Sequence, residues 1–196
     1  MNTSTPTLAS ATEAEAPAST SPWPVFWVAS TAIFLVSLDA TLLFAAFAAL
    51  REAFPAASAA DLSWVLNAYT VVYAAMLIPA GGLADRHGRK RIFLIGAALF
   101  LAGSAACGLA PSVGGLVAAR VLQAVGAALL TPASLSLVLD AFPISRRAVA
   151  VSLWGAVSGV AAAAGPSLGS LVIDVAGWPW AFFINVPIGA WSIWRG

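Results

Sequence analysis

Charged residues divide this chain into long apolar runs, and the lengths of these runs predict its helices. A helix that spans a membrane needs about 20 mostly apolar residues in succession. Residues 62–84, 148–173 and 175–194 carry no charge, and the stretch 92–139 carries only Arg120. A Pro-Ser-Val-Gly-Gly sequence at 111–115 divides that last stretch in two. We therefore predict transmembrane helices near 25–50, 62–84, 92–110, 114–138, 148–172 and 180–194.

The sixth of these runs is the shortest, with about 15 residues before the sequence stops, fewer than a full crossing needs. The runs are continuous and rich in alanine and leucine rather than alternating, which favours helices over a membrane β-barrel. Small residues spaced four apart, Gly155 with Gly159 and Gly165 with Gly169, let helices approach closely in lipid. The predicted fold class is an all-α polytopic membrane protein, a six-helix bundle whose sixth helix is truncated.

Composition supports this prediction and excludes other classes of protein. Of the 196 residues, 61% are hydrophobic and 9% are charged, with a mean hydropathy of +0.93, whereas a soluble globular domain carries about 25% charged residues. With one cysteine, Cys107, and one histidine, His87, the chain offers neither an intrachain disulfide nor a metal site of His and Cys ligands. No cofactor is expected. The net charge of +1 gives no reason to expect nucleic acid as a partner.

The distribution of charge predicts the orientation in the membrane. Residues 1–22 are rich in Ser, Thr, Ala and Pro, which predicts a disordered cytoplasmic tail ahead of a helical bundle over 23–196. Basic residues follow the second, fourth and sixth runs, and connections enriched in Lys and Arg are normally cytoplasmic. We therefore expect a multi-pass protein of the cell membrane with a cytoplasmic N-terminus. The basic residues are Arg86, Arg89, Lys90, Arg91, Arg146, Arg147 and Arg195, and the opposite side holds Arg51, Glu52, Asp61 and Asp174.

A glycine-rich and basic motif, GGLADRHGRKR at 81–91, follows the second run. A basic cytoplasmic loop alone would need neither Asp85 nor the glycines, so we interpret the motif as a structured gating loop. It resembles the cytoplasmic loop signature of the major facilitator superfamily. In that family the loop latches the two halves of a carrier in one state of the transport cycle, and the resemblance assigns this role to Asp85 and Arg89. The gating-loop residues are Gly81, Asp85, Arg86, Gly88, Arg89 and Lys90.

Two charges, Asp39 and Arg120, fall inside predicted helices. Counted along their helices, each lies about 9 Å from the outer edge of a hydrocarbon core about 30 Å thick. Arg120 could snorkel to the outer surface, but intramembrane charges are costly, and we favour an interior partner. We hypothesise that the two face a shared cavity and that Asp39 takes up a proton during transport. A static ion pair is the alternative. The sequence RVLQAVG from Arg120, which contains Gln123, also resembles a superfamily signature implicated in proton transfer in antiporters.

The fifth and sixth runs resemble the antiporter branch of this superfamily. GAVSG at 155–159 and GPSLG at 165–169 resemble its helix-five signature, although Ser170 replaces the last glycine. Ordinary close packing of helices is the alternative interpretation. GWPWAFFINVPIG at 177–189 resembles the start of helix six in drug:proton antiporters with fourteen helices, with Pro179 where arginine is usual. The helix-five residues of this motif are Gly155, Gly159, Gly165, Pro166 and Gly169.

Together these resemblances imply the N-terminal half of a carrier that exports amphipathic organic compounds or drugs in exchange for protons, by alternating access. The implied partners are a small amphipathic organic substrate, protons, the lipid bilayer and a missing C-terminal half. A facilitator-family carrier of another solute, and a non-transporting truncated membrane protein, remain alternatives. An enzyme is not expected, because His87 lies on a basic loop away from Cys107 and the spans contain no paired carboxylates.

Overall fold

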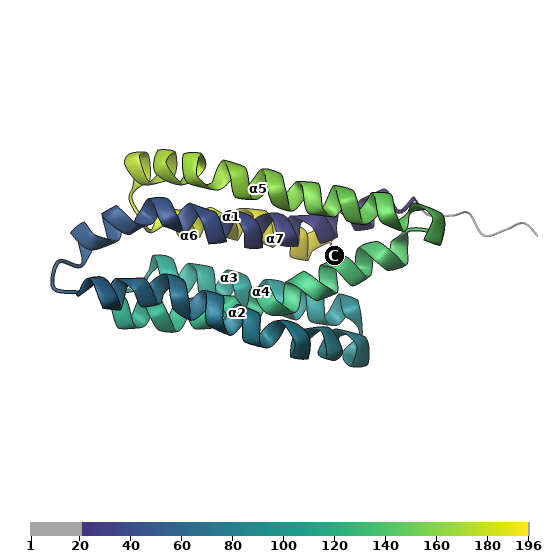
Figure 1. Cartoon of the computed structure of the whole chain (residues 1–196), viewed down its shortest axis with the longest axis horizontal. Helices are drawn as coiled ribbons and strands as arrows, with labels where there is room; N and C mark the ends of the chain where they lie inside the picture. Colours follow the sequence, from purple (N-terminus) through teal and green to yellow (C-terminus); the bar gives the residue numbers. More distant parts are fainter. Residues whose placement is uncertain (1–20, 196) are drawn as a thin grey trace, which may run out of the picture.

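The computed structural model describes residues 21–195, which form long helices joined by short connections (Figure 1). Most of the predicted tail at 1–22 lies outside the described residues, so the tail stays a prediction. The helices are α1 (Trp23–Ala53), α2 (Ala59–His87), α3 (Arg89–Gly108), α4 (Val113–Ala141), the 3₁₀ turn η1 (Ile144–Arg146), α5 (Arg147–Ala176), α6 (Trp180–Phe183) and α7 (Asn185–Arg195).

Five of the described helices, α1 to α5, are long and apolar enough to cross a membrane. The run predicted as one helix over 180–194 is divided, because α6 ends at Phe183 and α7 begins at Asn185. Pro187 gives the physical reason for the break. Proline has no N–H to donate to the carbonyl four residues earlier, which is that of Phe183, and its ring crowds that carbonyl.

Local sequence signals set where α2 and α4 begin. Ser58 and Asp61 form a reciprocal cap on α2: the Ser58 hydroxyl accepts from the Asp61 N–H at 3.1 Å, and the Asp61 carboxylate accepts from the Ser58 N–H at 3.0 Å. The Ser112 hydroxyl caps α4 by accepting from the Gly115 N–H at 3.2 Å. Helices α2 and α3 meet at Gly88, whose φ of +92° is a conformation that side-chain-bearing residues rarely adopt.

Helix α4 lies at the centre of the bundle. It packs along α2 and α3 and also contacts α1 and α5, while α1 packs along α5, and α7 contacts both α1 and α3. The close approach of α3 to α4 depends on glycine, since a Cβ on Gly103 would lie 2.6 Å from the backbone nitrogen of Gln123. Polar side chains on α4 can therefore meet groups from α1, α2 and α3 in the interior.

Helices α2 and α5 leave most of their surface uncovered. Only 22% and 17% of their apolar spans are buried, against 50% and 56% for α1 and α4. Large apolar side chains such as Val71, Ile78, Val160 and Leu171 are exposed on them. This surface is suited to contact with lipid or with another apolar helical bundle.

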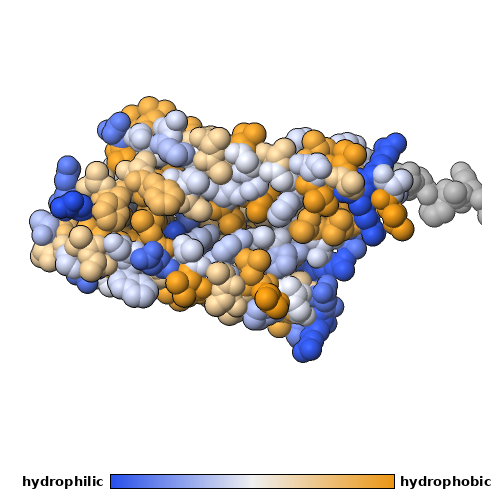
Figure 2. Space-filling model, in the orientation of Figure 1, coloured by the Kyte–Doolittle hydropathy of each residue, from blue (hydrophilic) through white to orange (hydrophobic). Residues whose placement is uncertain are grey.

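The two ends of the bundle differ in charge. The seven basic residues that we expect from the sequence on the cytoplasmic side lie at the end that also contains the start of α1, and we call this the basic end. Figure 2 shows hydrophilic residues gathered strongly at this end, on the right of the view, and apolar or pale residues over most of the middle. This is the distribution expected of a bundle that crosses a bilayer.

Candidate functional site

A buried ion pair between α1 and α4 is the main candidate for a functional site. Arg120 donates to the Asp39 carboxylate at 2.6 Å, and the two side chains are only 1% and 2% exposed. Arg120 therefore does not reach the outer surface. Its Nε donates to the backbone carbonyl of Val65 at 3.2 Å, and its guanidinium lies 4.0 Å from the centre of the Tyr69 ring, both on α2. The arginine thus connects three helices through one planar group.

Two amide side chains complete the surroundings of Asp39. Gln123, one turn along α4 from Arg120, donates to Asp39 Oδ1 at 2.8 Å and accepts from Arg120 at 2.7 Å. Asn185, the first residue of α7, donates to the same oxygen at 3.0 Å. The Asp39 carboxylate therefore accepts three hydrogen bonds, which offset much of the cost of burying it.

Ser104 on α3 connects these amides to the break between α6 and α7. Its hydroxyl accepts from Asn185 at 3.0 Å and from Gln123 at 3.3 Å, and it donates to the carbonyl of Phe182 at 2.8 Å. Cys107, also on α3, donates to the Gln123 side-chain carbonyl at 3.7 Å. Residues from α1, α3, α4 and α7 thus share one buried hydrogen-bonded network, which we call the Asp39 network.

Two polar atoms beside this network have no hydrogen-bond partner among the described residues, the side-chain carbonyl of Asn185 and the hydroxyl of Tyr69. Buried polar atoms without partners are costly and infrequent in native proteins. The side-chain carbonyl of Asn185 is a hydrogen-bond acceptor, and it lies on the same amide that donates to Asp39. Rotation of this amide exchanges its donor and acceptor ends. The network can therefore adopt a second arrangement.

The gating residues predicted from the sequence lie on helices rather than in a loop. Gly81, Asp85 and Arg86 belong to α2, Arg89 and Lys90 begin α3, and Gly88 alone joins the two helices. The expectation that these residues form a structured loop was wrong in secondary structure, because one glycine with positive φ suffices to turn the chain between the two helices.

Arg89 nevertheless contacts Asp85, at 3.5 Å, and it also pairs with Asp140 at the end of α4. The Arg89 side chain is 36% exposed, and those of Asp85 and Asp140 are 65% and 53% exposed. Arg89 therefore connects α2, α3 and α4 at the basic end.

Sequence reasoning missed Asp140, Ser104 and the position of Asn185. Asp140 carried a signal, since it is an acidic residue in the last turn of α4, close in sequence to the bases at 146–147. Ser104 carried none, because a lone serine in an apolar helix usually bonds to its own backbone. Asn185 is a polar residue in an apolar run, which is a signal, but its partner lies 146 residues away in the sequence.

The helix-five glycines divide into two groups. A Cβ on Gly165 would collide with Thr41, and one on Gly169 would lie 2.9 Å from the carbonyl of Leu42, so this part of α5 packs directly on α1. Gly155 and Gly159 have no atom within 4 Å of where a Cβ would be. Pro166 lies within α5 and is exposed. One half of the motif therefore packs inside this bundle and the other half faces outward.

Similarity to known proteins agrees with this architecture. The tetracenomycin C resistance and export protein of Streptomyces glaucescens is 39% identical over 175 residues, which cover 89% of this chain and 32% of that protein. The multidrug resistance protein Stp of Mycobacterium tuberculosis is 40% identical over 159 residues, which cover 81% of this chain and 29% of that protein. The chain thus spans about a third of the length of these curated relatives.

The fold agrees with that of solved membrane transporters. A crystal structure of a POT family transporter in complex with 5-aminolevulinic acid superimposes with a TM-score of 0.74 at 18% identity, covering 89% of this chain and 37% of that one. The sequence model of the Major Facilitator Superfamily matches residues 29–194. On this evidence the chain belongs to the Major Facilitator Superfamily.

Proposed function

We propose that this chain forms one bundle of a proton-coupled exporter of small amphipathic organic compounds, which works by alternating access in the cell membrane. The observation that carries the proposal is the buried Asp39 carboxylate, paired with Arg120 inside a bundle of membrane-spanning helices. An ionisable group at such a depth is costly and marks an ion or proton pathway. The similarity to a resistance and export protein and to a multidrug resistance protein supports the direction of transport and the class of substrate.

The proposed carrier needs a second helical bundle. Carriers of this type bind substrate between two halves that move against each other, and this chain spans about a third of its relatives' length. The uncovered surfaces of α2 and α5, with Gly155 and Gly159 open on α5, are where we place the second bundle. The basic end would face the cytoplasm, in keeping with the enrichment of bases in cytoplasmic connections.

Protonation of Asp39 would change the contact between α1 and α4. A neutral carboxyl attracts Arg120 less strongly than a carboxylate does. Arg120 would keep its hydrogen bonds to Gln123 on α4 and to Val65 on α2, neither of which involves α1. Proton uptake would therefore weaken the link from α1 to α4 while α2 and α4 remain connected, which gives the proton a means to favour one state of the transport cycle.

Asn185 would accommodate the added proton. A protonated Asp39 needs an acceptor for its O–H, whereas Asn185 presents its donor end to Asp39 at 3.0 Å. Rotation of the Asn185 amide would place its side-chain carbonyl, which has no partner among the described residues, at that position. The start of α7 would then respond to the protonation state of Asp39 on α1.

Arg89 would act at the basic end as the gate. It connects Asp85 on α2 with Asp140 on α4, so it stiffens the end of the bundle that would close against the second half. These pairs are partly exposed and can break at small cost, which suits a contact that must form and open in each cycle.

The proposal can be tested with an Asp39→Asn variant, in proteoliposomes that contain the protein together with its second bundle. We expect the variant to lose drug accumulation driven by an imposed pH gradient but to retain exchange of labelled for unlabelled drug, which needs no net proton movement. Asp174→Asn, which removes an acidic residue at the opposite end of the bundle, should retain both activities. Gradient-driven accumulation by Asp39→Asn would refute the proton role, and transport only of non-amphipathic solutes would refute the substrate class.

A further inference from the structure

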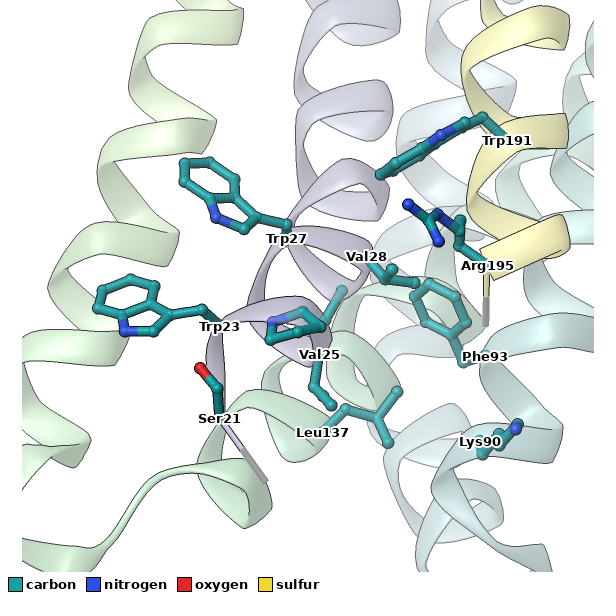
Figure 3. Close-up of a pocket in the computed structure, with 12 residues that line it drawn as sticks. Ser21, Trp23, Val25, Trp27, Val28, Lys90, Phe93, Leu137, Trp191 and Arg195 are labelled. Atoms are coloured by element: carbon teal, nitrogen blue, oxygen red, sulfur yellow. The ribbon is translucent and has the colours of Figure 1, made fainter. Parts of the chain in front are cut away.

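A cavity at the basic end lies apart from the Asp39 network. Its volume is about 730 Å³, within the range of about 300–1,000 Å³ typical of ligand sites. Its lining comes from the start of α1, the start of α3, the end of α4 and the end of α7. Figure 3 shows the indole rings of Trp23 and Trp27 on one side of the view, and Phe93, Lys90 and Arg195 on the other.

The position of the cavity indicates that it faces the lipid bilayer and not the second bundle. None of its lining residues belongs to α2 or α5, the helices whose uncovered surface we assign to the second bundle. The cavity lies at the level of the basic residues, where the hydrocarbon of a bilayer gives way to headgroups. Trp23, Trp27 and Trp191, three of the lining residues, are 43%, 57% and 42% exposed, and tryptophan is enriched at this interface of membrane proteins.

The charge of the cavity is positive and unbalanced. Lys90 and Arg195 are both exposed lining residues, and no acidic residue is among the lining. Neither base forms an ion pair within the described part of the chain, whereas their neighbour Arg89 pairs with both Asp85 and Asp140. Among the described residues, both acidic groups of this end are thus engaged by Arg89, and the two bases of the cavity remain available to an anion.

We infer that this cavity binds an anionic phospholipid of the membrane leaflet at the basic end. The phosphate of the headgroup would lie between Lys90 and Arg195, and an acyl chain would follow the apolar wall formed by Val28, Phe93 and Leu137. Basic pockets between transmembrane helices on the cytoplasmic side are known to bind such headgroups, and the apolar wall distinguishes a lipid from a free anion. The inference depends neither on the direction of transport nor on its coupling to protons.

The test compares two double variants of the whole chain in detergent, with bound lipid counted by native mass spectrometry. Lys90→Ala with Arg195→Ala removes both bases of the cavity. Arg91→Ala with Arg146→Ala removes two bases from the same end that do not line it. Each protein is titrated with phosphatidylglycerol and, separately, with phosphatidylcholine of the same acyl chains. Thermal melting of each variant verifies that it remains folded.

We expect the parent protein to retain phosphatidylglycerol in preference to phosphatidylcholine. The cavity variant should bind phosphatidylglycerol roughly 30-fold more weakly, as expected for the loss of two bases near a membrane surface, while the control variant should bind as the parent does. Equal weakening in both double variants would overturn the site, because it would show a general effect of charge.

Two further measurements distinguish other occupants of the cavity. Displacement of the lipid by inorganic phosphate at equal concentration would overturn the lipid assignment in favour of a free anion. A variant without residues 1–20, which contain Glu13 and Glu15 and no base, tests whether that acidic segment fills the cavity. Binding of phosphatidylglycerol only after this deletion would overturn the inference for the whole chain, whereas equal binding before and after supports it.

Discussion

Two arginine–carboxylate contacts in this molecule use the same chemical groups in opposite surroundings. The side chains of Arg120 and Asp39 are 1% and 2% exposed. Gln123 forms hydrogen bonds with both of them, and Asn185 donates a hydrogen bond to Asp39. The side chains of Arg89 and Asp85, which pair at the basic end, are 36% and 65% exposed. A buried pair cannot lose one partner without leaving a charge in a medium that solvates it poorly, while water replaces a lost partner at the surface.

The difference explains how the two contacts can serve different purposes. Proton uptake by Asp39, as we propose it, removes the buried negative charge that faces Arg120, so a single proton can bias the conformation. Breaking the Arg89 contacts costs little, so they can open and close repeatedly. Each of the following predictions tests one side of this contrast, beginning with the largest expected effect.

Replacing Arg120 with alanine should give the largest loss of stability. The change leaves Asp39 buried without its charged partner, at a cost of about 3–5 kcal/mol in free energy of unfolding. Thermal unfolding of the purified protein in detergent measures the loss. The double variant Arg120→Leu with Asp39→Leu removes both charges and should be more stable than Arg120→Ala alone. If the double variant were less stable than Arg120→Ala, the loss could not be attributed to an unpaired buried charge, and the contrast between the buried and the exposed contact would fail.

Replacing Gly103 with alanine should disturb the Asp39 network without altering any of its polar groups. A Cβ there would lie 2.6 Å from the backbone nitrogen of Gln123, so α3 and α4 must separate, at a cost of about 1–3 kcal/mol. Gly155→Ala is the matched control, because no atom lies within 4 Å of its Cβ position. Detergent unfolding should show a clear loss for the first variant and none for the second.

Replacing Gly88 with alanine tests the backbone rather than the charges of the basic end. At a φ of +92° a side chain is strained, with an expected cost of about 1–2 kcal/mol. The variant should unfold at a lower temperature than Gly82→Ala, because Gly82 lies within α2 and has open space at its Cβ position. Equal melting temperatures for the two would show that the turn between α2 and α3 tolerates a side chain.

Replacing Arg89 with alanine should have the smallest effect on stability. Partly exposed pairs contribute about 0–1 kcal/mol each, and their contribution falls as salt rises. We expect a small loss in unfolding temperature at low salt that disappears at high salt, measured beside Arg91→Ala as a control with no ion pair among the described residues. A loss as large as that of Arg120→Ala, unaffected by salt, would remove the contrast between the two contacts.

Much of the fold could be predicted because it depends on local sequence. Uncharged runs of sufficient length indicated the helices, and counting residues along them placed Asp39 and Arg120 at one depth, where the structure finds them in contact at 2.6 Å. Depth along an axis follows from a constant rise per residue. Which faces of two helices meet does not follow from this rise, so the contacts of Asn185 and Ser104 with the same network were not foreseen.

The gating motif shows the same limit. Its residues were expected in a loop, but α2 continues to His87 and a single glycine makes the turn. The second partner of Arg89, Asp140, lies at the end of another helix. Helix packing brings it there, and no spacing within the motif could indicate it.

The sequence alone determined that this protein consists of membrane-spanning helices, how its basic residues are distributed, and which two charges lie within the bundle. These properties follow from the hydropathy of consecutive residues and from the fixed geometry of a helix. Tertiary structure decided that Asp39 accepts three hydrogen bonds, that the side-chain carbonyl of Asn185 has no partner among the described residues, and that residues of four helices line a basic cavity. Each of these depends on the rotation and spacing of helices distant in sequence, which packing of the whole bundle determines.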